Sequence, residues 1–133
     1  MIYLSSVREW LKTLITAQHY YVGKLDKKPE RAVGVYQRKN PAPPVRAIGG
    51  ESTYEIKPIS ILIHWNKNAD ETEKAAMELY QHIIRAASSM TIGDTQVYFI
   101  KLLQSEPVDI GTDEAGIYER VIEFDIYFER NDT

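Results

Sequence analysis

Residues 117–130 alternate between apolar and polar side chains, and this alternation limits what the chain can fold into more than any other feature. Successive side chains of a strand point to opposite faces, so the segment predicts a strand with one buried face and one solvated face. We expect the buried side chains to be Ile122, Phe124, Ile126 and Phe128. At about 13 residues this strand is long, so we expect it to overhang the core and to be available for pairing with a neighbouring subunit.

Two helices are predicted, over residues 6–16 and 68–88, because apolar side chains recur there at three- and four-residue spacing. The second has the stronger period. Each begins with a capping box, in which a polar side chain and a glutamate three residues later satisfy free backbone groups of the first turn. The two boxes are Ser6 with Glu9 and Asn68 with Glu71.

β-branched and aromatic residues predict four more strands. Residues 19–25 and 32–37 are separated by a polar turn, so we expect them to form a hairpin. The other two strands are expected over 54–65 and 95–103.

Residues 38–52 hold three prolines and two glycines, and residues 105–116 hold one proline and two glycines, so both are predicted to be flexible loops. The order of elements is then α-β-β-β-α-β-β. The predicted fold class is α+β, with a mostly antiparallel sheet and two helices packed on one face. At 133 residues the chain fits a single domain, residues 1–133.

Opposite charges gather in different parts of the chain, although the net charge is only −3. Residues 24–46 contain seven Lys and Arg against two acids, and residues 104–133 contain nine acids against two Arg. Such segments can be two solvated surfaces. Alternatively, the basic patch of one copy meets the acidic patch of the next, which suits a head-to-tail contact that closes into a ring.

Motifs that carry chemistry are weak. The absence of cysteine excludes disulfides, thiolate zinc sites and thiol nucleophiles. No spacing places two of His19, His64 and His82 on one face as metal ligands. Glu55 and Lys57 faintly resemble the acid-x-lysine end of a metal-dependent nuclease motif, a distant alternative for which no second acid lies upstream on a strand end to share the ion. We therefore expect no enzyme activity, catalytic residue, metal ion or cofactor.

Nucleic acid and membrane are also poor candidates as partners. Arg38, Lys39 and Arg46 flank the proline-rich loop, with Tyr36 nearby for stacking, and such a loop can contact phosphates. The acidic balance, however, argues against specific nucleic-acid recognition. No secretion signal is visible, and no apolar run approaches the ~20 residues that cross a bilayer.

The whole pattern resembles the phage minor capsid and tail-terminator (head–tail joining) proteins, including the lambda-type tail terminator. The resemblance lies in element order and in sequence texture, not in a catalytic signature. Four segments carry it: VGVY at 33–36, ISILIHW at 59–65, AAMELY at 75–80 and YERVIEFDIYF at 118–128.

This resemblance implies a virion protein, made in the host cytoplasm, that forms a ring, expected to be a hexamer. The ring would cap the tail tube and dock to the head connector, with the proline-rich loop on a neighbouring ring. Its partners would be other copies of itself, the tail tube protein and connector proteins. Another neck or head-completion adaptor is the alternative. We expect the contact residues to include Arg38, Lys39, Arg46, Glu119, Glu123 and Asp125.

Overall fold

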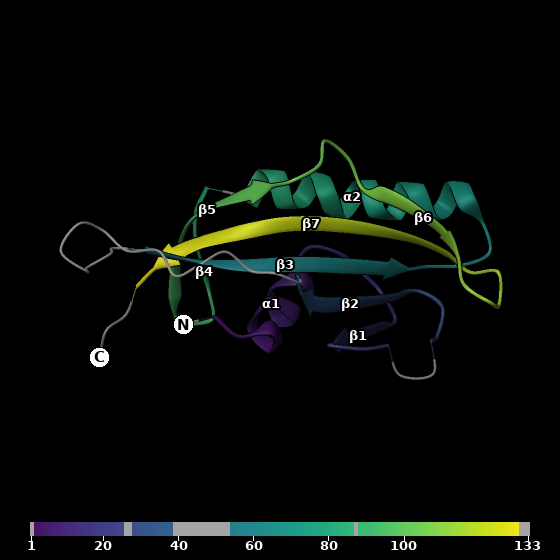
Figure 1. The fold of residues 1–133 in the computed structure, drawn as a ribbon, viewed down its shortest axis with the longest axis horizontal. Coiled ribbons are helices and arrows are strands. Elements are labelled where there is room, and N and C mark those ends of the chain that lie inside the picture. Colours follow the sequence, from purple (N-terminus) through teal and green to yellow (C-terminus); the bar gives the residue numbers. More distant parts are fainter. Residues whose placement is uncertain (1, 26–27, 39–53, 87, 131–133) are drawn as a thin grey trace.

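The computed structural model describes residues 2–25, 28–38, 54–86 and 88–130 (Figure 1). It confirms the α+β class, with two helices and one mostly antiparallel sheet. The elements are α1 (Leu4–Leu11), β1 (His19–Val22), β2 (Ala32–Gln37), β3 (Tyr54–His64), α2 (Ala69–Ala86), β4 (Ser88–Ile92), β5 (Thr95–Leu102), β6 (Val108–Thr112) and β7 (Tyr118–Glu129). Of the helices in these ranges, none has the length and apolar character needed to span a bilayer.

The last strand, β7, lies in the interior of the sheet. The strand order is β1-β2-β3-β7-β5-β4, and β6 also pairs with β7. One edge of β7 pairs with β3 from Glu119 to Glu129, and its other edge is shared between β6 and β5 (Figure 1). The expectation that this strand overhangs the core with a free edge is therefore wrong. Its length serves three partners within the chain.

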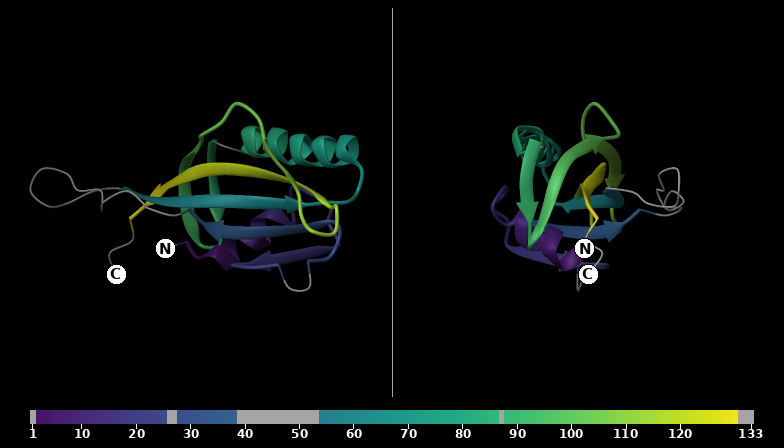
Figure 2. Two further views of the ribbon diagram at one scale, coloured as in Figure 1. Left: turned by 45° about the vertical axis from the view of Figure 1, so that its right-hand side comes forward. Right: turned by 90° about the vertical axis from the view of Figure 1, so that its left-hand side faces the viewer.

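Both helices lie against one face of the sheet, as predicted (Figure 2). Strand register explains which side chains meet them, since residues paired across β3 and β7 share a face. Ile59 is opposite Phe124 and Ile61 is opposite Ile122, and all four are buried. Trp10 of α1 packs edge-on against Phe124, with ring centroids 6.3 Å apart. One apolar cluster joins both helices to β2, β3 and β7.

Of the two predicted capping boxes, the structure contains one in part and contradicts the other. Asn68 caps α2, since its Oδ1 accepts a hydrogen bond of 3.0 Å from the backbone N–H of Glu71. The Glu71 carboxylate binds the side chain of Asn66 instead of closing the box on Asn68. The Ser6 box is wrong, because α1 begins at Leu4 and its cap residue, Tyr3, makes no side-chain cap bond. Ser6 thus lies inside the first turn.

Strands β1 and β2 are parallel, so the predicted hairpin is also wrong. After β1 the chain turns at Gly23, whose φ of +80° is in the left-handed region. It then returns over the outer face of the sheet, where Leu25 lies above Gly34 of β2. A Cβ at Gly34 would be 3.2 Å from Leu25 Cδ2 and 2.9 Å from Tyr36 Cε2, so glycine makes room for this return. The connection therefore delivers β2 in the same direction as β1.

Two strands were not predicted. β4 forms an antiparallel hairpin with β5 through a turn at Gly93 and Asp94. β6 lies within residues 105–116, where the sequence predicts a flexible loop. All five residues of β6 are exposed, and its register on β7 shifts at Gly111, whose φ is +88°. A strand of five residues with a bulge and a glycine is too short for its alternation to stand out, which explains why its sequence looks like a loop.

Candidate assembly surfaces

Two of the residues expected at an interface, Arg38 and Asp125, contact each other within one chain. Nη1 of Arg38 lies 2.8 Å from Oδ1 of Asp125, and both side chains are largely buried. The contact is close but is not aligned as a hydrogen bond, so Oδ1 has no hydrogen-bond donor among the described residues. The guanidinium also donates a long bond of 3.4 Å to the carbonyl of Phe124. The basic and acidic segments of the sequence therefore meet inside the subunit at this point.

The other acidic residues expected at an interface lie on the same outer face of β7. Glu123 accepts a hydrogen bond of 3.0 Å from the side chain of Gln104. Glu119 is opposite His64 in the register of β3 and β7. Burial raises the pKa of Glu119, and the nearby Asp113 raises it further, while His64 and Lys28 act in the opposite direction. Lys39 and Arg46, the remaining members of the set, lie outside the described residues.

A second meeting of basic and acidic segments surrounds His64, a side chain with no solvent exposure. Its Nδ1 lies 2.7 Å from the carbonyl oxygen of Pro29, in the β1–β2 connection. Its Nε2 lies 2.8 Å from Oδ2 of Asp113, in the β6–β7 connection. A carbonyl and a carboxylate both accept, so the ring satisfies both partners only as an imidazolium that donates from each nitrogen. His64 thus fastens two loops to the end of β3.

Hydrogen bonds within its own turn stabilise the ionised form of Asp113. The hydrogen bond from His64 lowers the pKa of Asp113 to about 2, from an ordinary value of 3.8. Backbone N–H groups of Ile117 and Ala115 donate to its Oδ1 at 3.0 Å and 2.9 Å and lower the pKa further. The carboxylate of Asp113 therefore stays ionised over the whole neutral range.

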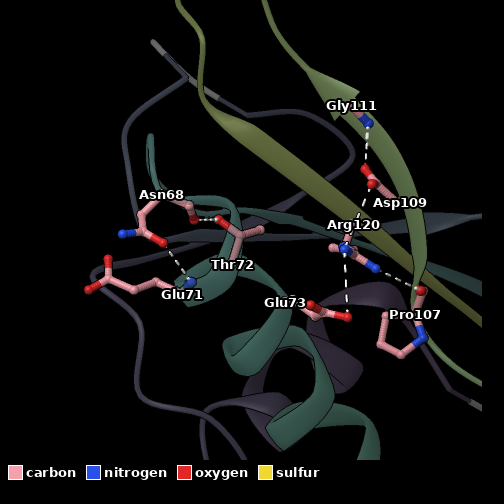
Figure 3. A network of polar contacts seen from close by, with 8 residues as sticks. All are labelled: Asn68, Glu71, Thr72, Glu73, Pro107, Asp109, Gly111 and Arg120. Atoms are coloured by element: carbon pink, nitrogen blue, oxygen red, sulfur yellow. Dashed lines mark hydrogen bonds and ion pairs between the residues drawn. The ribbon is translucent and has the colours of Figure 1, made fainter.

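Arg120 ties β6 and β7 to α2 (Figure 3). Its guanidinium lies 3.7 Å from the Asp109 carboxylate and 4.0 Å from that of Glu73, and it donates a long bond of 3.5 Å to the carbonyl of Pro107. The side chain of Asp109 in turn accepts from the backbone N–H of Gly111 at 2.8 Å. This network fixes the bulged strand against the body of the subunit.

The distant nuclease alternative gains nothing from the geometry. Glu55 lies 4.0 Å from the guanidinium of Arg130, and Lys57 donates a bond of 3.4 Å to the side chain of Gln37. Within the four described ranges, no three His, Asp or Glu side chains gather in a group that could hold a metal ion.

Comparison with known protein families gives a match that covers nearly all of the elements described above. The family model described as bacteriophage tail terminator protein matches residues 6–130, from α1 to the residue after β7. None of the curated proteins compared with the chain matches it significantly. The family is a structural, non-enzymatic one, and the match confirms the resemblance drawn from element order. The chain belongs to the bacteriophage tail terminator protein family and is a structural component of the phage tail.

Proposed function

We propose that copies of this chain assemble head to tail into a hexameric ring that caps the tail tube and docks to the head connector. The observation that carries the proposal is the family match over residues 6–130. A cap of this kind needs a repeated contact between different surfaces of one subunit, because only such a contact closes into a ring.

The arrangement of charge supports a contact between different surfaces. β1 and β6 lie toward opposite sides of the sheet, with β2, β3 and β7 between them. The exposed Lys24 and Lys28 follow β1, whereas the exposed Glu106 and Asp109 lie before and in β6. Unlike charges on opposite sides of a subunit favour head-to-tail encounter over the pairing of like surfaces.

The residues expected at the interface from the sequence remain proposed contacts, with one change. Arg38 and Asp125 already form an ion pair inside the subunit, so a neighbour would meet them as a neutral pair and not as two separate charges. The contact residues proposed are Arg38, Lys39, Arg46, Glu119, Glu123 and Asp125.

Mass photometry at several salt concentrations tests ring formation. Six copies of the 15.3 kDa chain give a particle of about 92 kDa. Because salt screens exposed charges, we expect the ring to weaken between low and high ionic strength. A chain that stays monomeric at high protein concentration, in low salt and in the presence of purified tail tubes, contradicts the proposal.

Binding to isolated virion parts separates the tail terminator role from another neck role. We expect the protein to bind the ends of purified tails and to halt the growth of tail tubes when it is added during polymerisation. Binding to filled heads without binding to tails would assign it instead to a head-completion adaptor.

A further inference from the structure

Four aromatic side chains lie together on the outer face of the sheet, which is the face opposite the helices. They are Tyr54, Tyr98, Phe99 and Tyr127, and we name them the aromatic shelf. Phe99 stacks on Tyr127 with ring centroids 4.2 Å apart, and Tyr54 stacks on the same ring at 5.8 Å. The shelf thus runs across three adjacent strands, β3, β7 and β5.

A bulge in β5 widens the shelf. Val97 is opposite Phe128, and the next pair is Phe99 with Tyr127, so Tyr98 is an extra residue in the ladder. In a regular strand Tyr98 and Phe99 would point to opposite faces. Here both line one hollow of about 420 Å³, and they are 44% and 45% exposed. The irregularity turns a normally buried position into part of an open aromatic surface.

Charged groups border this surface. The outer face of β7 carries Glu123, Asp125 and Glu129, with Glu129 directly opposite Tyr54. Lys101 of β5 is opposite Asp125, which also contacts Arg38. Because Arg38 pairs with Asp125, the carboxylate that directly borders the shelf is Glu129, opposite Tyr54, and a segment with apolar rings and a flanking positive charge suits this surface.

Residues 39–46 of this chain have that chemistry. Their sequence is KNPAPPVR, with three prolines between a lysine and an arginine. Pro41 and Pro44 are three residues apart, which is one turn of a polyproline II helix, so both rings can meet one surface. Grooves lined by aromatic side chains recognise this spacing, and proline lowers the entropy lost when the segment is ordered.

We propose that the aromatic shelf of one copy binds residues 39–46 of a neighbouring copy. Both ends of the intervening segment are at the shelf. Arg38, which precedes it, lies against Asp125, two residues before Tyr127, and the segment ends at Tyr54, itself a shelf residue. An extended chain of 15 residues spans at most about 50 Å, so a segment held at Arg38 and Tyr54 could extend no more than about 25 Å, which is enough to reach a neighbouring subunit.

Arg38 and Tyr54, which flank the ligand segment, both lie near the receptor, and binding of the segment of one copy to the shelf of the next repeats around a ring. This inference rests on the proposed self-assembly and names the contact that drives it. It gives the proline-rich segment a partner within the ring, in place of the neighbouring ring expected from the sequence.

Disulfide trapping tests the contact, because the chain has no cysteine of its own. Asn40→Cys and Lys101→Cys place one thiol beside the prolines and one beside the shelf. We expect the two variants, mixed and oxidised, to give a covalent dimer of about 31 kDa, well above the amount formed with Glu78→Cys, an exposed position on α2. The proposal is wrong if Asn40→Cys crosslinks to Lys101→Cys and to Glu78→Cys in equal yield. It is also wrong if a chain that carries both Asn40→Cys and Lys101→Cys crosslinks only within itself.

A peptide assay separates this inference from ring formation. The receptor is the full chain with Pro41, Pro43 and Pro44 changed to Ala, so that its own segment does not compete. We expect it to bind a synthetic peptide of residues 38–47, and Phe99→Ser in the same background to weaken binding about tenfold. Ile84→Ser, at an apolar position of α2 with 46% exposure, is the matched control and should leave binding unchanged.

The two proposals can then fail separately. If the wild type and Phe99→Ser both form rings and the peptide does not bind, the shelf contact is wrong and the proposal of ring formation stands. Peptide binding by a chain that never assembles supports the shelf as a receptor and counts against the ring.

Discussion

Nε2 of His64 lies 2.8 Å from Oδ2 of Asp113, and the histidine is fully enclosed by the β1–β2 and β6–β7 connections. The two residues are 49 positions apart, so the contact holds together parts of the chain that no local interaction joins. It also makes the end of the sheet sensitive to the charge of one carboxylate.

Asp113→Asn should remove an acid-dependent part of the stability. The pKa of Asp113 is lowered to about 2 in the folded chain, so between about pH 2 and 4 the unfolded chain binds more protons. This contribution is fully present above the ordinary pKa of 3.8 and is lost as the pH falls toward 2. Urea denaturation from pH 2.5 to 6 should show the wild type and the variant converging at the acid end. Glu114→Gln, an exposed neighbour, should leave the pH profile unchanged.

His64→Ala should destabilise the fold at neutral pH by about 2–4 kcal/mol, because it leaves a cavity and two acceptors without their donor. Equilibrium denaturation measures the loss. His19→Ala, at an exposed histidine of β1, serves as the control and should change stability by less than about 0.5 kcal/mol. Equal effects at both positions would show that the enclosed contacts of His64 contribute nothing.

Asn68→Ala should cost about 1 kcal/mol, since it removes the oxygen that accepts the backbone N–H of Glu71. Asn68→Ser retains an acceptor and should recover most of that loss. Ser6→Ala should be neutral within about 0.5 kcal/mol, because Ser6 does not cap α1. Thermal unfolding of the three variants checks the set, and a loss at Ser6 as large as at Asn68 would contradict the start of α1 at Leu4.

Phe124→Ala should cost about 3–5 kcal/mol, because Phe124 is fully buried against Trp10 at the centre of the core. Phe99→Ala removes the same side chain from the exposed shelf and should cost only about 1 kcal/mol through its lost stacking on Tyr127. Denaturant titration of both variants compares a core phenylalanine with a surface one. Similar losses would mean that Phe99 serves the fold and not a partner.

The sequence predicts which face of each strand is buried far better than it predicts the neighbours of that strand. Alternation in residues 117–130 correctly identifies Ile122, Phe124, Ile126 and Phe128 as buried, because burial on one face imposes a two-residue period directly. The same alternation is silent on direction and on strand order. For that reason the parallel pairing of β1 with β2 and the central place of β7 were not predictable.

The contacts within the candidate sites could not be predicted from the sequence, for related reasons. Arg38 and Asp125 were identified by their charge, but their mutual contact depends on a register between distant strands. His64 stood in an apolar strand with no visible partner, since Pro29 and Asp113 approach it only in the fold. The shelf required the bulge at Tyr98, because alternation alone places Tyr98 and Phe99 on opposite faces. The four residues of the shelf are dispersed in the sequence, and only Tyr54 lies near the proline-rich segment.

The central position of β7 has a consequence for biosynthesis. The strand that joins β3 to β5 and β6 is the last of the sheet to be made, so no earlier nascent chain can complete it. Until β7 is available, β3 and β5 each present an unpaired edge and apolar side chains that it will later cover. Such edges are templates for wrong pairing. Closure of the sheet therefore waits for the synthesis of β7, and the complete fold exists only once this strand is in place.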